Sequence, residues 1–175
     1  MFNLFKDRFP VTHSEKEGVI DNSLDMLKHT IRGLIKEKFS SKLKIYVLDS
    51  GSCNGCELEL QLLFSPLYEL SFLGLEVVYD IIEADILLIT GLMTENMYVE
   101  LEMIYGKLKE PKRVITVGDC PVFTAPFKET FALKNNAEIF YSSSYHIVGC
   151  PPEPIAILEG LKEYLKKDEY SHQKS

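Results

Sequence analysis

The chain has 175 residues with 46% apolar and 26% charged side chains, a composition typical of a folded domain rather than a disordered segment. Its 19 basic and 26 acidic residues give a net charge of −7, which argues against nucleic acid as a partner. The longest uncharged apolar stretch, Ile86–Met93, is shorter than the roughly 20 residues that a membrane-spanning helix needs.

Residues 1–40 are expected to form an N-terminal extension with one amphipathic helix over about 22–39. Apolar residues recur there at helical spacing, namely Leu24, Leu27, Ile31, Leu34, Ile35 and Phe39. The polar residues between them are mainly basic. The helix either covers one side of the domain core or lies against a membrane or a membrane subunit.

Residues 41–175 alternate between apolar strands and amphipathic helices. The expected strands are 43–48, 75–79, 85–90, 113–117 and 146–148, and the expected helices are 57–70, 96–109 and 154–166. Continuous apolar strands that alternate with helices predict an α/β domain with a mainly parallel sheet and helices on both faces.

The four cysteines all follow predicted strands. Cys53 and Cys56 lie in the loop after 43–48, Cys120 follows 113–117, and Cys150 follows 146–148. Because ligand sites of parallel sheets form at the carboxyl ends of the strands, we expect the four sulfur atoms to converge there. The N-terminus lacks the long apolar run of a secretory signal, so we expect a reducing compartment, the cytoplasm.

Four converging thiolates are typical of a zinc site or an iron–sulfur cluster. Structural zinc sites usually draw their ligands from two close pairs, whereas here one pair is followed by two single cysteines. Glycines at 51, 55, 118 and 149 would let the backbone approach a bulky cluster. A structural zinc domain stays open as an alternative. So does a thiol–disulfide oxidoreductase with Cys53-x-x-Cys56 at a helix start, although it would give Cys120 and Cys150 no role.

Three segments resemble those of one family. Gly51-Ser-Cys-Asn-Gly-Cys-Glu57, Gly118-Asp-Cys120 and Gly149-Cys-Pro-Pro-Glu-Pro154 are similar to the small electron-transfer subunit of energy-converting NiFe hydrogenases and respiratory complex I, the 20 kDa type. The resemblance covers about residues 43–165. It implies a flavodoxin-like fold and one 4Fe–4S cluster whose ligands are Cys53, Cys56, Cys120 and Cys150.

The resemblance also implies a role and partners. The chain would relay electrons to a NiFe-hydrogenase-type large subunit and have no catalytic centre of its own. The further partners would be a ferredoxin-like cluster subunit and an integral membrane subunit of an ion-translocating complex, on the cytoplasmic side of the membrane. Glu57 follows a ligand candidate, so its carboxylate would tune the cluster or accept protons, or would simply stabilise a helix start.

Two details place the chain within this family. The Cys-Asn-Gly-Cys spacing is similar to the hydrogenase branch, and the chain lacks a cysteine-rich C-terminal extension, so one cluster is expected. The segment Cys120-Pro-Val-Phe-Thr-Ala-Pro-Phe127 lacks the paired glycine that usually follows the third cysteine. The alternative function is therefore the equivalent subunit of a sulfane-sulfur reductase or of a quinone-reducing, complex I-like assembly.

Overall fold

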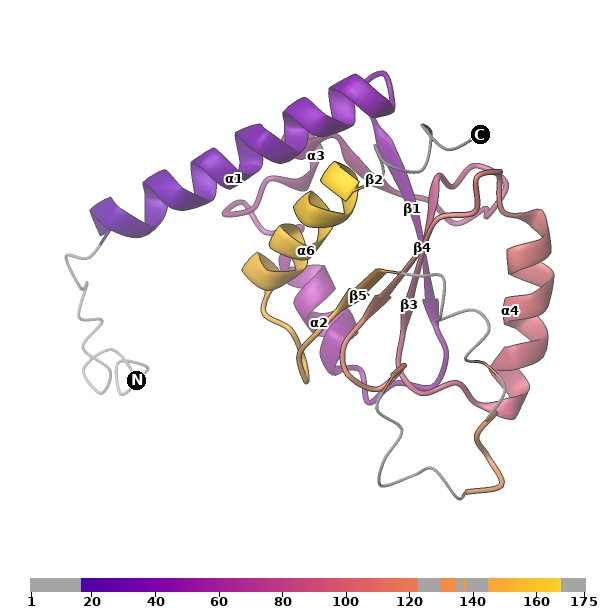
Figure 1. The fold of residues 1–175 in the computed structure, drawn as a ribbon. Coiled ribbons are helices and arrows are strands. Elements are labelled where there is room, and N and C mark those ends of the chain that lie inside the picture. Colours follow the sequence, from indigo (N-terminus) through magenta and orange to yellow (C-terminus); the bar gives the residue numbers. More distant parts are fainter. Residues whose placement is uncertain (1–16, 123–129, 135–136, 138–144, 168–175) are drawn as a thin grey trace, which may run out of the picture.

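A five-stranded parallel sheet forms the centre of the computed structural model, which describes residues 17–122, 130–134, 137 and 145–167 (Figure 1). Its strands are β1 (Leu43–Asp49), β2 (Leu75–Val77), β3 (Ile86–Thr90), β4 (Val114–Val117) and β5 (Tyr145–Ile147). They lie in the order β2-β1-β3-β4-β5, and every neighbouring pair is parallel. This is the flavodoxin-like strand order, so the predicted fold class is confirmed.

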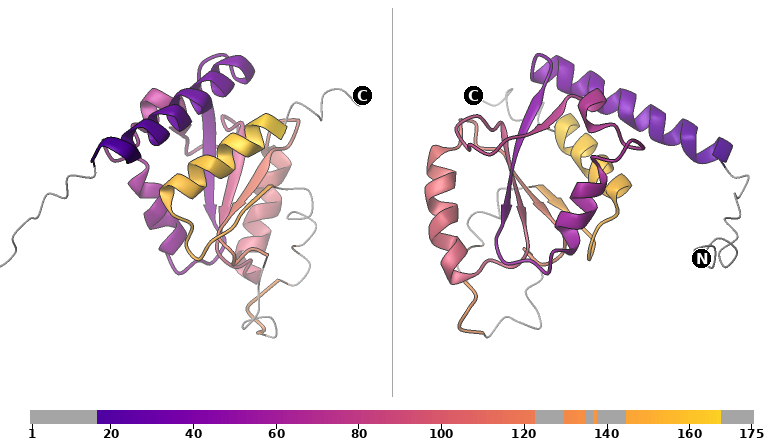
Figure 2. Two further views of the ribbon diagram at one scale, coloured as in Figure 1. Left: turned by 60° about the vertical axis from the view of Figure 1, so that its left-hand side comes forward. Right: turned by 180° about the vertical axis from the view of Figure 1, so that it is seen from behind.

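Helices cover both faces of the sheet (Figures 1 and 2). One face carries α1 (Glu17–Lys38), α2 (Gly55–Leu62), α3 (Leu70–Leu73) and α6 (Pro154–Lys167), and the other carries α4 (Glu95–Lys107). Strand β3 is buried along its whole length. Its Ile86 and Leu88 pack in the apolar cluster of the first face, while Leu87 and Ile89 pack in that of the second. This alternation follows from the two-residue period of a strand.

Helix α1 packs its apolar face on the domain core. Leu24, Leu27, Ile31 and Ile35 are all buried in the cluster that includes residues of α3 and α6. The apolar face is therefore covered by protein, as the first interpretation of this helix expects, while Arg32 and Lys36 on its polar face are exposed. Lys28 is buried on the same helix, where its ammonium pairs with Glu69 at 3.3 Å.

The single helix predicted over 57–70 is wrong, because the chain forms the two separate helices α2 and α3 there. Pro66 explains the break, since proline donates no backbone hydrogen bond and disfavours helical geometry in the residue before it. Before Pro66 the helix tightens: the Phe64 amide donates to Gln61 and the Ser65 amide to Leu62, at 3.0 and 2.9 Å.

Candidate functional site

The cysteine-bearing loops lie together at the carboxyl ends of the strands, at the lower end of the sheet in Figure 1. Cys53 lies in the loop between β1 and α2, and Cys56 lies in the first turn of α2. Cys120 follows β4, and Cys150 lies between β5 and α6. The side chain of Cys56 is buried, Cys120 is half-buried, and Cys53 and Cys150 are exposed. The site therefore has a buried side and a side open to the surface.

The cysteines contribute to one another's electrostatic environment. Burial, followed by the negative charges of Glu57 and of the other three cysteines, raises the pKa of the Cys56 thiol to about 12. Burial also raises the pKa of Cys120, with smaller contributions from Cys150 and Cys53. The raised pKa values of Cys56 and Cys120 favour the protonated thiols in the absence of a cationic centre.

Gly118 allows the Cys120 loop to approach Cys56. Its φ is +90°, a conformation that favours glycine. A Cβ atom at this position would lie 2.5 Å from the Cys56 sulfur and would displace it. The absence of a side chain at Gly118 therefore provides the space in which this sulfur sits.

Two aspartates fix the loops that carry the cysteines. The Asp49 carboxylate accepts hydrogen bonds from the Gly51 and Ser52 amides at 2.8 and 2.7 Å. The Asp119 carboxylate accepts one from the Gly149 amide at 2.8 Å, and the Asp119 amide donates to the Gly149 carbonyl at 2.8 Å. Asp119 thus joins the Cys120 loop to the Cys150 loop. Since these glycine amides already have acceptors, Gly51 and Gly149 serve the turns of the backbone rather than offer free donors.

Glu57 links the first cysteine loop to the sheet. Its half-buried carboxylate accepts hydrogen bonds from the hydroxyls of Ser52, at 2.8 Å, and of Thr90. The Ser52 hydroxyl in turn accepts a hydrogen bond from the Asn54 amide at 2.9 Å. Sequence reasoning singled out Glu57 but missed Ser52 and Thr90. Two features of the sequence could have indicated them: Ser52 directly precedes Cys53, and Thr90 is the one polar residue of the otherwise apolar strand Ile86–Thr90.

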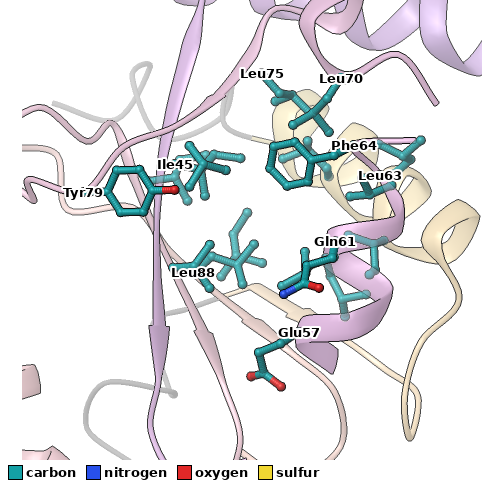
Figure 3. Close-up of a pocket in the computed structure, with 18 residues that line it drawn as sticks. Ile45, Glu57, Gln61, Leu63, Phe64, Leu70, Leu75, Tyr79 and Leu88 are labelled. Atoms are coloured by element: carbon teal, nitrogen blue, oxygen red, sulfur yellow. The ribbon is translucent and has the colours of Figure 1, made fainter. Parts of the chain in front are cut away.

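An apolar cavity of about 250 Å³ lies between the sheet and helices α2, α3 and α6 (Figure 3). Glu57, Gln61 and Tyr79 supply the polar groups of its lining, and the other lining side chains are apolar. Figure 3 shows Glu57 at one end of the cavity, near the start of α2, and Tyr79 beyond β1. Glu57, the residue after Cys56, therefore also lines the cavity, which the sequence did not predict.

The described ranges contain neither a site for a single metal ion nor a membrane-spanning helix. In residues 17–122, 130–134, 137 and 145–167, no group of three His, Cys, Asp or Glu side chains has the geometry to hold a single metal ion. In the same ranges, no helix has both the length and the hydropathy to cross a membrane. Most of the segment that departs from the family pattern after Cys120 lies outside the described residues.

The strand order and the four clustered thiols define a flavodoxin-like α/β domain with a cysteine site at the carboxyl edge of its sheet. The chain belongs to the family described as NADH ubiquinone oxidoreductase, 20 Kd subunit, which matches residues 53–164. The family that the three cysteine motifs predicted is thereby confirmed.

Relatives in this family carry names from related complexes. The chain is 33% identical over 123 residues to a probable membrane-bound hydrogenase subunit of Pyrococcus furiosus, covering 70% of this chain and 74% of that protein. It is 31% identical over 142 residues to formate hydrogenlyase subunit 7 of Escherichia coli, covering 81% of this chain and 54% of that protein. A chain in the structure of the membrane-bound sulfane sulfur reductase, an archaeal respiratory membrane complex, is similar with a TM-score of 0.57 and 26% identity, covering 71% of this chain and 69% of that one.

Proposed function

We propose that the chain is an electron-relay subunit that binds one 4Fe–4S cluster through Cys53, Cys56, Cys120 and Cys150. The observation that carries the proposal is the meeting of four thiols from three loops at one edge of the sheet, in a chain of this family. When bound, such a cluster supplies one-electron transfer. The chain itself would bind and orient the cluster, and the catalytic centre would belong to a partner.

Two features of the surroundings support the binding of a cluster. Gly118 has no Cβ atom to clash with the Cys56 sulfur, so this proposed ligand can occupy its place. Helix α2 begins at this site with no side-chain cap from Asn54, so its positive end is available to stabilise the negative charge of a thiolate-bound cluster. The exposure of Cys53 and Cys150 would place one side of the cluster at the surface, where electrons enter or leave.

The proposed partner is a large subunit of the NiFe-hydrogenase type. Beside the cysteine site, α2 and the turn after it expose large apolar side chains, namely Leu58, Leu62, Phe64 and Leu67, each with more than half of its surface accessible. Exposed apolar patches of this kind mark protein interfaces. A ferredoxin-like cluster subunit and an integral membrane subunit would complete an ion-translocating complex. The chain would then be peripheral on the cytoplasmic side of the membrane.

A sulfane-sulfur-reducing complex is a second candidate, because a chain from such an assembly shares this fold at 26% identity. A quinone-reducing assembly like complex I is the third, supported by the family description. The chain itself serves the same relay role in all three. Assays of the purified complex with hydrogen, polysulfide and quinone distinguish them, because each complex turns over with its own substrate.

The first test is the composition of the chain after anaerobic purification. We expect a brown protein with about four iron and four sulfide per chain and an electron paramagnetic resonance signal in the reduced state. Replacing any of the four cysteines by serine should lower the iron content and change or abolish the signal. A colourless chain that contains zinc would contradict the proposal and favour a structural zinc domain.

The same variants test a thiol–disulfide oxidoreductase. Such an enzyme needs a thiol whose pKa is depressed, whereas the pKa of Cys56 is raised. If disulfide exchange were the function, Cys120→Ser and Cys150→Ser would keep the activity of the chain. Loss of iron in these two variants, with no exchange activity in the parent chain, would exclude that alternative.

A further inference from the structure

A basic groove lies at the opposite end of the sheet from the cysteines, between α1, the turn that follows it and α3. It has a volume of about 590 Å³, and its polar lining consists of His29, Arg32, Lys36, Ser40, Ser41, Lys42 and Ser71. Ser41 and Lys42 directly precede β1, whose other end leads to the Cys53 loop (Figure 1). A strand of 7 residues spans about 23 Å, so the groove is separate from the cysteine site.

The groove contains two cations, Arg32 and Lys36, that have no carboxylate partner among the described residues. His29, Arg32 and Lys36 lie at helical spacing along α1, so they share one face of that helix. Arg32 and Lys36 form no ion pair within the described ranges, in contrast to Lys28, which is buried and paired with Glu69. Lys42 approaches from the far side of the groove and makes an exposed pair with Glu76 at 3.0 Å. A chain of net charge −7 thus concentrates unneutralised positive charge at one place.

Phe72 of α3 holds the guanidinium of Arg32 in position. The Arg32 Cζ atom lies 4.3 Å from the centre of the Phe72 ring, a distance typical of cation–π stacking. The His29 ring meets the same phenylalanine edge-on, with ring centres 5.5 Å apart and an angle of 87°. Because stacking uses the face of the guanidinium plane, the N–H donors along its edge stay free for an anion.

We infer that this groove binds a phosphate group, as a phosphomonoester or a phosphodiester. Arginine matches two phosphate oxygens with paired N–H donors, lysine adds a point charge, and serine hydroxyls donate further hydrogen bonds. Lys36 in the last turn of α1 also stabilises the negative end of that helix. Helix stabilisation explains neither Lys42 on the far side nor the three serines. The inference does not depend on the proposed cluster, which lies at the other end of the sheet.

The phosphate has two possible sources, an anionic lipid headgroup or a free phosphorylated compound, and the experiment separates them. The full chain is purified anaerobically and titrated with inorganic phosphate, and binding is followed by NMR. In a second assay, the chain is mixed with vesicles of phosphatidylglycerol and phosphatidylcholine. Vesicles of phosphatidylcholine alone are the control. The double variant Arg32→Gln/Lys36→Gln removes two charges from the groove. The control Lys107→Gln/Lys166→Gln removes two exposed charges from α4 and α6, so both variants have the same net charge.

We expect the groove variant to weaken binding at least about tenfold and the control to leave it unchanged, because anionic surfaces attract nearby basic residues individually. Binding of phosphate and of phosphatidylglycerol vesicles assigns the groove to a lipid headgroup, whereas binding of phosphate alone assigns it to a free compound. Equal losses in the two variants, or no binding of either probe, would overturn the inference. Because the four replaced side chains are exposed, we expect both variants to keep the melting temperature of the parent chain, and thermal unfolding checks this.

Discussion

At Gly118 the cysteine site depends on the absence of a single methyl group. Alanine there would place its Cβ 2.5 Å from the Cys56 sulfur at a φ of +90°. We expect Gly118→Ala to lose iron and to reduce the free energy of unfolding by about 1–3 kcal/mol, since both strain and overpacking contribute. Iron analysis and urea denaturation measure the two effects.

Gly106 provides the matched control for that substitution. It lies in α4, and a Cβ built there meets nothing within 4 Å. Gly106→Ala should keep all the iron and stabilise the helix by about 0.5–1 kcal/mol, because alanine favours helical geometry more than glycine does. Equal iron content in the two alanine variants would show that the space at Gly118 is not needed by the site.

His146 predicts a pH dependence of stability. Its Nδ1 atom lies 2.8 Å from the Thr116 hydroxyl, and its buried Nε2 has no hydrogen-bond partner in the part of the chain that the structure describes. Burial lowers the pKa of this imidazole below its usual 6.5, and the charge of Asp119 opposes the shift only in part. As the pH falls below about 6.5, the unfolded chain therefore takes up a proton before the folded chain does, and the free energy of unfolding decreases.

Comparing His146→Asn with the parent chain measures how much His146 contributes to the pH dependence of stability. Asparagine can keep a hydrogen bond to Thr116 but does not titrate, so the decrease in stability between about pH 7 and about pH 5 should be smaller in the variant. Urea midpoints at the two pH values measure the difference. An equal decrease in both proteins would assign the pH dependence to other groups.

The cysteines and the residues that fix them differ in how far the sequence could predict them. Each cysteine follows an apolar strand, and the rule for parallel sheets then suffices to bring the loops together. The contacts of Glu57 with Ser52 and Thr90 depend on the register of β1 against β3, which pairs Asp49 with Thr90. Register comes from long-range packing, so a local sequence pattern does not contain it.

At the scale of elements, α2 and α3 show where periodicity misleads. Apolar residues continue at helical spacing past Leu62, and this pattern predicted one helix to residue 70. The restriction that Pro66 imposes on the backbone is stronger than the pattern, so the chain turns and forms α3 instead. The other helices and the strands were predicted within a few residues, since no proline interrupts their apolar patterns.

The outer face of α2 carries a prediction about assembly. Leu58 and Leu62 are 53% and 51% exposed and lie one helical turn apart, next to the cysteine loops. We expect Leu58→Gln/Leu62→Gln to reduce copurification of the proposed large subunit by at least about tenfold, because apolar anchors dominate the energy of interfaces. Iron content and thermal stability of the chain should change little, since both side chains are already in contact with solvent.

Helix α4 offers a matched control on the opposite face of the sheet. Val99 and Met103 are 58% and 57% exposed and are also one helical turn apart. Val99→Gln/Met103→Gln should leave copurification unchanged. If this variant lost the partner while the α2 variant kept it, the proposed interface would be on the wrong face.

At the scale of the whole molecule, the cysteine site and the basic groove lie at opposite ends of the parallel sheet. The four thiols lie at the carboxyl ends of its strands, and the basic groove with Arg32 and Lys36 lies at the amino end of β1. Helix α1 contributes to the second site only because it folds back on α3 and α6 (Figure 2). Its attachment to the core therefore determines whether the two sites belong to one cooperative unit.

Ile31 tests that cooperativity. Its side chain is fully buried between α1 and the core, so Ile31→Ala should reduce the free energy of unfolding by about 2–5 kcal/mol, whereas Met26→Ala, at a side chain that is 71% exposed, should change it little. If α1 and the sheet unfold together, the midpoints measured by circular dichroism and by the absorbance of the proposed cluster will shift to a lower temperature by the same amount in Ile31→Ala. The opposite outcome, in which the helical signal is lost at a lower temperature while the absorbance of the proposed cluster keeps its midpoint, would show that α1 unfolds separately from the sheet. Because the buried contacts of α1 run along both α3 and α6, we expect a single transition.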